Sequence, residues 1–363
     1  MKYTILTLLL TMTSPALFGQ SNDIWTAFWD EDETSYGYKD KNDVIKIEPK
    51  FIWFLNARKF ENIIAVTEEA GTTWRSYYLT KTGREIEARL YTSDMSVDCE
   101  CEGFIRFKDP ETHLVGMLNR HGDVAIPAEY NDLMRVMNGM IVGLKGAEKE
   151  YWDERRLSDA HFSWIGGKEV LIDTLNNVII DNFTYDNSLN FFTLKKADVP
   201  DPDTIRKSFL AVDGSYYSFV DSEKEFKQWL TDDLFSDLTS EKLINNSSDT
   251  ITWESAEDYG KTDKRKLITD NFSTLKNGML EILNPACDFS ILGESFYTFV
   301  YNDKEFEKYY DNCGRFKEWI YPAMVLVISH DDENDYSQNH YTFLRTDDGY
   351  KLISIVVRNE EIK

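Results

Sequence analysis

The stretch Leu114–Lys145, LVGMLNRHGDVAIPAEYNDLMRVMNGMIVGLK, contains one complete β unit of this chain. Two short apolar segments, LVGMLN and VAIPAEY, flank the turn Arg120–Asp123, where Gly122 can adopt the positive φ that a tight hairpin turn needs. Pro127 lies where strand pairing should end, because proline has no backbone N–H to donate. A third segment, NGMIVGLK, follows a second turn. The stretch therefore predicts a three-stranded antiparallel unit.

Weaker copies of this unit recur between Ile24 and Phe219. A period near forty that is rich in strand signals predicts a β-repeat array, propeller-like or solenoid-like, because one unit cannot bury its apolar face alone. One interval between successive copies is longer than the others. We attribute the extra length to an insertion, the charged segment 147–166, for which we expect short helical structure. Residues typical of tight turns stand between short apolar segments at five positions, 40, 39, 54 and 38 residues apart: Asp43, Gly83, Gly122, Asn176 and Gly214.

The unit resembles that of the WG-repeat (KWG) proteins, roughly W-G-[YF]-[IV]-[DN]-x-x-G-x-x-[VI]-I-P-x-x-[YF]-[DE] followed by F-x-x-G-[LM]-[AI]-x-V. Val115-Gly116 and Tyr36-Gly37 replace the Trp-Gly pair. The resemblance covers residues 20–220 and implies β-repeat binding or scaffold modules without a shared catalytic motif. The matching residues are Val115 to Asn119, Gly122, Ile126-Pro127, Tyr130-Asn131 and Asn138 to Val142, and, in the first unit, Tyr36 to Asp40, Val44-Ile45, Pro49 and Phe51.

Residues 1–19 have the pattern of a secretory signal peptide. Lys2 precedes the apolar run Ile5–Met12, and Ser14–Gly19 supplies the small residues of a cleavage zone. The apolar run is too short to span a bilayer, which takes about 20 apolar residues. We therefore expect a secreted or periplasmic mature protein with no stable membrane insertion.

The chain is strongly acidic, with 40 Lys and Arg against 64 Asp and Glu and a net charge of −24. A surface of this charge argues against nucleic-acid partners, because the phosphate backbone repels it. The densest basic group, Lys261 with Lys264 to Lys266, is interpreted as a solvated turn or helix end.

Residues 221–363 are predicted to form an α+β domain with an antiparallel sheet. Apolar residues at a spacing of three to four predict an amphipathic helix in 221–244, beginning with a capping box from Ser222 to Glu225. We expect further helical stretches at 266–283 and 303–319. Strands are predicted at 295–302, 323–330, 340–347 and 350–357, and the last hairpin resembles those of cystatin-like and nuclear-transport-factor-like cone-shaped domains.

The chain has four cysteines: Cys99, Cys101, Cys287 and Cys313. In an oxidising compartment we expect Cys287 to pair with Cys313, because both lie in the C-terminal region. Cys99 and Cys101 share one face of a strand and are interpreted as a redox Cys-x-Cys or as two structural thiols. Zinc is disfavoured because only His113 lies close to them in sequence.

Three further groups of residues are candidates for chemistry. The loop His330–Asp335, together with His340, offers imidazoles and carboxylates for a metal ion, but we favour an acidic hairpin tip. Cys313 could act as a nucleophile with a histidine as base, although a disulfide is favoured over this. Asp201–Asp203 lies in a proline-rich loop without the spacing of a calcium site. The sequence has no G-x-S-x-G elbow and no glycine-rich phosphate loop. We therefore nominate no catalytic residue, cofactor or metal ligand.

The aromatic residues of the first unit are the candidates for ligand binding, since exposed aromatic rings on β repeats can stack on sugars or grip peptides. The alternative, which we favour, is that most of them form the core between repeats. The sequence thus predicts an exported interaction protein whose repeats bind a protein or glycan of the cell envelope, the alternative being an envelope hydrolase with its chemistry in the C-terminal domain. The candidate binding residues are Trp25, Trp29, Trp53 and Trp74.

Overall fold

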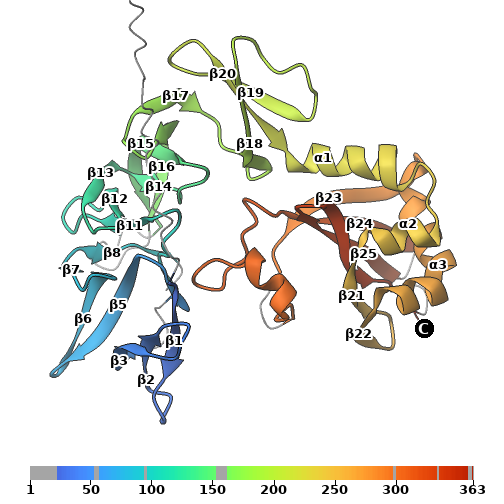
Figure 1. Ribbon diagram of the computed structural model, residues 1–363. Helices are drawn as coiled ribbons and strands as arrows, with labels where there is room; N and C mark the ends of the chain where they lie inside the picture. The colour runs from blue at the N-terminus through green and yellow to red at the C-terminus, as the bar shows by residue number, and fades with distance from the viewer. Residues whose placement is uncertain are drawn as a thin grey trace, which may run out of the picture.

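The computed structural model describes residues 23–52, 57–93, 96–152, 162–296, 300–332, 335–358 and 362. The expected signal peptide, residues 1–19, lies outside these ranges. Within them the chain forms mostly antiparallel strands, and the longer helices are confined to the C-terminal part, which begins at Ser222 (Figure 1). Across the described ranges, no helix is both long and apolar enough to cross a membrane.

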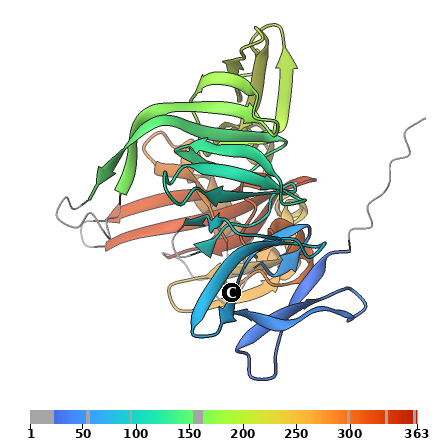
Figure 2. The same ribbon diagram turned by 90° about the vertical axis from the view of Figure 1, so that its left-hand side faces the viewer.

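The N-terminal part, residues 23–221, is a succession of small antiparallel sheets, here called the array. Figure 2 shows these sheets one above another, from blue at the bottom to yellow-green at the top. The first sheet has the order β4-β1-β2-β3-β5-β6-β7. Its strands are β1 (Trp25–Trp29), β2 (Ser35–Lys39), β3 (Ile45–Ile52), β4 (Lys59–Phe60), β5 (Ile63–Ala70), β6 (Thr73–Thr80) and β7 (Glu85–Ile86).

Three smaller sheets follow, with the orders β13-β12-β11-β8, β14-β15-β16-β17 and β18-β20-β19. The described strands thus form an array of sheets, without a closed propeller or a regular solenoid among them. Their bounds are β8 (Arg89–Leu90), β11 (Phe104–Lys108), β12 (Val115–Asn119), β13 (Val124–Tyr130), β14 (Asp132–Leu133), β15 (Met140–Tyr151), β16 (Phe162–Asp173), β17 (Val178–Phe183), β18 (Leu189–Ala197), β19 (Arg206–Leu210) and β20 (Tyr216–Asp221), and a separate ladder pairs β9 (Thr92–Ser93) with β10 (Ser96–Val97).

All five predicted turns are present, and all five have the same backbone hydrogen bonds. In the central one, Gly122 N–H donates to Asn119 O (2.9 Å) and Asn119 N–H donates to Asp123 O (2.8 Å). The residue at the Gly122 position has a positive φ in every copy, from 60° to 85°. This is a type I turn closed by a left-handed residue, a geometry that favours Gly, Asn and Asp. The equivalent residues are Asp43, Gly83, Asn176 and Gly214.

The aromatic residues of the first unit mostly lie in its core. Tyr36, Tyr38, Tyr77 and Phe51 are at most 1% exposed and pack in one cluster. The Tyr38 hydroxyl donates to the Ala57 carbonyl at 2.7 Å, so this polar atom is satisfied inside the core. Packing among the strands of the first sheet therefore buries these aromatic rings.

The insertion is a β hairpin in its described part, so the expected helical structure is wrong there. β15 and β16 pair continuously from Ala147↔Gly166 to Tyr151↔Phe162. Lys149 lies over the rings of Phe162 and Trp164 on the opposing strand, at 4.5 and 5.4 Å. These cross-strand contacts stabilise two paired extended strands in preference to a helix.

The C-terminal part contains a six-stranded sheet of order β22-β21-β26-β25-β24-β23, antiparallel except for the β21–β26 pair. Helices cover one face of it (Figure 1), and Phe226, Leu275 and Met279 pack there against Leu326 and Phe343. The elements are α1 (Ser222–Gln228), η2 (Trp229–Leu234), α2 (Ser240–Asn245), β21 (Ser247–Glu254), β22 (Tyr259–Asp263), α3 (Lys264–Leu280), η3 (Glu281–Leu283), β23 (Asp288–Glu294), η4 (Lys304–Tyr309), β24 (Ala323–Asp332), β25 (Asp335–Thr346) and β26 (Gly349–Val356).

Several expectations for this part need correction. The N-cap of α1 is Asp221, whose carboxylate accepts from the backbone N–H groups of Glu223 and Lys224; Glu225 instead binds Arg345 at 2.8 Å. The helix expected at 303–319 is only the short 3₁₀ segment η4, and no strand lies in the described residues of 295–302. The basic group does begin a helix, since α3 starts at Lys264.

Two glycines with the same turn geometry can separate backbone strain from packing between repeats. A Cβ at Gly122 would lie 2.5 Å from Cδ1 of Ile86 in the preceding repeat, whereas a Cβ at Gly83 would meet nothing within 4 Å. We expect Gly83→Ala to lower the free energy of unfolding by about 1 kcal/mol through its positive φ alone. Gly122→Ala should lower it by about 2–3 kcal/mol, because strain and a steric clash add. Urea denaturation of both variants measures the difference, and equal losses would contradict packing of the turn against the neighbouring repeat.

Candidate functional site

The turn Asp311–Arg315, here called the clasp turn, joins the C-terminal part to the array. Asp311 N–H donates to Arg315 O (2.8 Å), Gly314 N–H donates to Asp311 O (3.0 Å), and Gly314 has a φ of 76°. These are the bonds of the five array turns. Asp311 Oδ1 also accepts from the N–H groups of Cys313 and Arg315, as Asn119 does from His121 and Asp123. The C-terminal part thus carries a sixth copy of the repeat turn.

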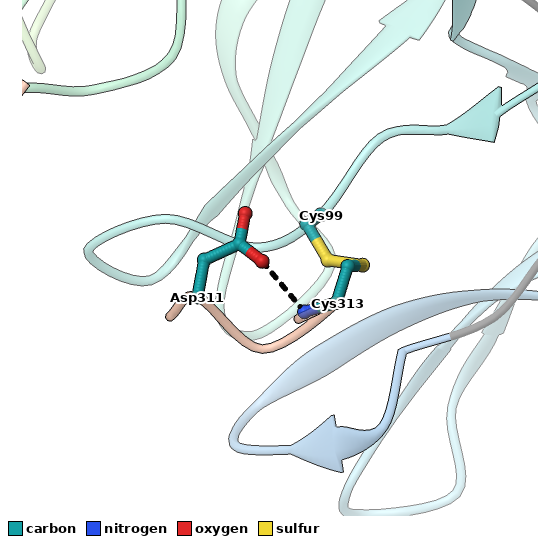
Figure 3. Close-up of side chains that lie close together, drawn as sticks. All are labelled: Cys99, Asp311 and Cys313. Atoms are coloured by element: carbon teal, nitrogen blue, oxygen red, sulfur yellow. Dashed lines mark hydrogen bonds between the residues drawn. A yellow bond between two sulfur atoms is a disulfide. The ribbon is translucent and has the colours of Figure 1, made fainter. Parts of the chain in front are cut away.

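The clasp turn docks on the edge of the first array sheet. Lys59 N–H on β4 donates to Asn312 O at 3.0 Å, and the Asn312 amide donates to the Glu61 carboxylate at 3.3 Å. A disulfide between Cys99 and Cys313 fixes the contact, with the two Cα atoms 6.2 Å apart (Figure 3). Backbone pairing and a covalent bond together hold the two parts at this point.

The expected Cys287–Cys313 pairing is therefore wrong. Cys313 pairs with Cys99, 214 residues away, while Cys101 and Cys287 are free thiols. Proximity in sequence is a poor guide here, because the fold brings the clasp turn to the array and leaves Cys287 at the start of β23. The bond also removes Cys313 as a candidate nucleophile in this state of the protein.

Two buried carboxylates hold the segment that carries Cys99. Asp98 accepts hydrogen bonds from Arg106 N–H (2.9 Å) and from its guanidinium Nε (3.0 Å) and Nη2 (2.5 Å). Burial acts to raise the pKa of Asp98, but the charge and hydrogen bonds of Arg106 outweigh it and the pKa is lowered. Glu100 accepts from the backbone N–H groups of Asn62 and Ile63, yet burial dominates there and raises its pKa.

Cys101 is two residues from the disulfide but is poorly suited to open it. Its thiol donates to the Val136 carbonyl at 3.2 Å, and burial raises its pKa to about 12. Thiol–disulfide exchange needs the thiolate, which such a pKa suppresses at neutral pH. The environment of Cys101 therefore favours a structural thiol over a redox Cys-x-Cys.

Cys99, Asp311 and Cys313 lie close enough to suggest a metal site (Figure 3). Both sulfur atoms are used in the disulfide, however, and the Asp311 carboxylate is occupied by the turn and by Arg315 Nε at 3.1 Å. No thiolate remains to bind a cation. Asp311 and Cys313 form the clasp turn, and Cys99 attaches it to the array.

The histidines considered as metal ligands do not converge. In the continuous β24–β25 ladder His340 pairs with Val327 and His330 pairs with Ser337. His330 is three residues from Val327, so the two imidazoles lie on opposite faces of the sheet. His330 Nε2 lies 2.9 Å from Glu281, and His340 Nε2 lies 3.4 Å from Gln338. The backbone is a hairpin arm, as the favoured interpretation expected, while residues 333–334 and the acidic side chains lie outside what the structure describes.

The side chains of three histidines contact polar groups other than a nucleophile. His113 lies near Arg89, His330 near Glu281 and His340 near Gln338. Asp201 in the proline-rich loop is paired with Arg206 at 3.2 Å and Lys195 at 3.4 Å. Its carboxylate therefore stabilises the loop.

A recess of about 330 Å³ lies between the array and the C-terminal part, and we call it the junction cleft. Its size is within the range of ligand pockets. Arg135, on the array side, stacks over Trp319 at 4.0 Å and lies 3.6 Å from Asp311, so the clasp turn holds it. The cleft is lined by Met134, Arg135, Met137, Tyr185, Asn187, Ser188 and Leu189 from the array and by Ser222, Glu223, Gly293, Glu294, Glu318, Trp319, Pro322, Ala323 and Met324 from the C-terminal part.

Three glutamates give the junction cleft a negative rim. Glu294 accepts from the Thr342 hydroxyl (3.0 Å) and Glu318 from the Ser295 hydroxyl (2.9 Å). Burial, and then the charges of Asp221 and Asp186, raise the pKa of Glu223. Within the described ranges, none of the three forms an ion pair. Arg135, the cation in the lining, contacts Asp311 and Trp319, so the three carboxylates of the rim leave the cleft with an excess of negative charge.

The structure does not gather the candidate tryptophans into one surface. Trp25 is half-buried and packs edge-on against Phe60 at 5.4 Å, while Trp29 and Trp74 are 37% and 60% exposed. β1 and β6 are separated by β2, β3 and β5, which is four steps of about 4.8 Å across the sheet. Trp53 lies outside the described residues. No local sequence pattern indicates the junction cleft, because its walls come from segments up to 190 residues apart.

In comparisons with known proteins, no family model, no curated protein and no solved structure matches this chain.

Removal of the disulfide should destabilise the junction. We expect Cys313→Ser to lower the free energy of unfolding by about 3–5 kcal/mol, because the bond closes a long loop. The matched control Cys287→Ser removes a free thiol and should change it by less than about 0.5 kcal/mol. Denaturation without reductant measures both, and thiol titration of the unfolded wild-type chain should find two free cysteines. Four thiols, or equal effects of the two substitutions, would refute the Cys99–Cys313 pairing.

The two buried carboxylates should respond to pH in opposite ways. Asp98→Asn should cost about 3 kcal/mol at pH 7, because it leaves Arg106 buried without its counter-charge. Since the folded-state pKa of Asp98 is lowered, this cost should shrink as the pH falls through that lowered pKa. Glu100→Gln should be nearly neutral at pH 7. Because the pKa of Glu100 is raised, the free energy of unfolding of the wild type should increase relative to that of Glu100→Gln as the pH falls through the raised pKa.

Unfolding free energies of the wild type and both variants, measured between pH 3 and pH 7, check these signs. Parallel pH profiles for Asp98→Asn and Glu100→Gln would contradict the electrostatic assignment.

Proposed function

We propose that this chain is an exported interaction protein that binds a basic segment of a protein partner in the junction cleft. In this proposal degenerate WG-type repeats (20–220) and the α+β part (221–363) act as one binding unit. The observation that carries it is the negative rim of Glu223, Glu294 and Glu318 in a cleft with apolar lining residues. Carboxylates without a cation partner favour a positively charged ligand.

The apolar residues that line the cleft favour a peptide ligand over a small ion. Met134, Met137 and Trp319 also line the cleft, and methionine side chains adapt to irregular apolar surfaces. Lysine and arginine have long aliphatic stems, which can cover such a surface while the charged ends reach the carboxylates. A glycan stacked on the exposed tryptophans is the other ligand class that the sequence suggests.

The proposed location of the protein is the periplasm or the outside of the cell. The signal-peptide pattern of residues 1–19 supports it, and so does the Cys99–Cys313 disulfide, because such bonds persist mainly in oxidising compartments. The disulfide also supports a preformed cleft, since a ligand then meets walls that are already fixed in place.

The test measures binding of a fluorescein-labelled peptide, Lys-Leu-Lys-Leu-Lys, by fluorescence anisotropy at low salt. The triple variant Glu223→Gln/Glu294→Gln/Glu318→Gln should bind about tenfold more weakly, because three attractive charges are lost. The control Glu31→Gln/Glu111→Gln/Glu257→Gln removes the same charge from exposed positions and should change the affinity less than about twofold. Wild-type binding should also weaken as the pH falls through the raised pKa of Glu223.

Equal losses of affinity in the two triple variants would contradict the proposal, because they would show that the net negative charge of the protein attracts the peptide non-specifically. Equally tight binding of Glu-Leu-Glu-Leu-Glu would reject a cation-selective cleft.

A further inference from the structure

A second recess lies beside the clasp turn and shares no lining residue with the junction cleft. This recess, here called the clasp pocket, has a volume of about 430 Å³. Arg58 and Lys59 form one side of it, and Tyr301, Lys304, Glu307 and Tyr310 form the other. The pocket is thus built from both the array and the C-terminal part.

Most charges around the clasp pocket are already neutralised. Lys59 Nζ lies 2.8 Å from Glu307, and this contact lowers the pKa of the glutamate. Asp303 is paired with Lys261. Asp311 is used by Arg315 and by the backbone of the clasp turn. None of these carboxylates is left to balance a further cation.

Two cations of the lining remain without a direct ion pair in the described part of the chain, although the charge of Lys304 helps to lower the pKa of Glu307. Among the residues that the structure describes, neither the Arg58 guanidinium nor the Lys304 ammonium forms an ion pair or a side-chain hydrogen bond, and both are exposed. Acidic residues outnumber basic ones in this chain, 64 to 40, so two unpaired cations lining the same recess are notable. They give the clasp pocket a positive character opposite to that of the junction cleft.

The clasp turn places one of these cations. A Cβ on Gly314 would lie 2.8 Å from Nη1 of Arg58, so the glycine allows the guanidinium to lie directly over the turn. The planar guanidinium can bind a carboxylate or phosphate through two parallel hydrogen bonds. Lys304 supplies a second, more flexible charge from the opposite side of the pocket.

The walls of the pocket are aromatic. The Tyr310 hydroxyl donates to the Tyr301 carbonyl at 3.1 Å, so the polar atom of Tyr310 is already satisfied and its ring remains as apolar surface. A volume of about 430 Å³ exceeds what a lone inorganic anion fills and lies within the range for small organic ligands. Aromatic walls with a cationic pair suit a ring that bears an oxyanion.

We propose that the clasp pocket binds a small ring-shaped ligand through a carboxylate or phosphate group, with Arg58 and Lys304 as its charge partners. The shared chemistry is an oxyanion on a sugar-sized ring. This site is independent of the junction cleft, so failure of either proposal leaves the other standing.

Isothermal titration calorimetry of the intact mature chain with glucuronate, glucose 6-phosphate and glucose tests the proposal. We expect at least one of the two anions to bind, and glucose to bind at least about tenfold more weakly. Whichever anion binds more tightly identifies a carboxylate or a phosphate as the preferred group. Arg58→Gln/Lys304→Gln should weaken anion binding at least about tenfold. The control Lys41→Gln/Lys266→Gln removes two charges at exposed positions outside the pocket and should have an effect below about twofold.

Absence of anion binding up to about 10 mM, or equal affinity for glucose, would overturn the proposal. Unchanged binding in Arg58→Gln/Lys304→Gln, or an equal loss in the control, would do the same. If the double variant unfolds below the wild-type midpoint, the two single variants replace it, and each should weaken binding at least about threefold.

Discussion

The arrangement of this molecule depends on one contact, the docking of the clasp turn on the edge strand β4 under a disulfide. Other contacts, such as the stacking of Arg135 on Trp319 and the ion pair of Lys59 with Glu307, also join the two parts, but this one adds a covalent bond. The contact uses the geometry of the array itself, because Asp311–Arg315 repeats the hydrogen bonds of the five array turns. An exposed strand edge invites pairing with other chains, and the clasp turn covers part of this edge from within the same chain.

Both recesses exist because of that contact. The junction cleft takes its walls from the array and from segments near β23 and β24, and the clasp pocket takes Arg58 from one side and Lys304 from the other. The unpaired charges are negative in the first recess and positive in the second. A strongly acidic protein thus keeps a local positive region where its two parts meet, which a net charge of −24 conceals.

Local chemistry explains what could be predicted from the sequence. Each array turn is specified within five residues by a Gly, Asn or Asp that tolerates positive φ, so all five could be located. Helix α3 and the final hairpin follow equally from periodicity and from Asp347–Gly349. Long-range packing explains the failures. Asp311–Arg315 has the same local signal in Gly314, but it lies in a charged stretch whose apolar spacing fits a helix, and no local pattern predicts its docking on β4. The faces on which His330 and His340 lie depend on strand register, which their separation of ten residues does not specify. The junction cleft requires Arg135 and Trp319 to meet, and no local pattern connects them.

The separation of 214 residues between Cys99 and Cys313 also imposes an order of assembly. A chain that emerges from its N-terminus presents Cys99 and Cys101 long before Cys313 exists as a partner. The fold distinguishes the two neighbouring cysteines, because the Cys101 thiol donates to the Val136 carbonyl while the Cys99 sulfur meets Cys313. The local sequence gives both cysteines the same context, so the partner of Cys99 depends on a segment that is made much later.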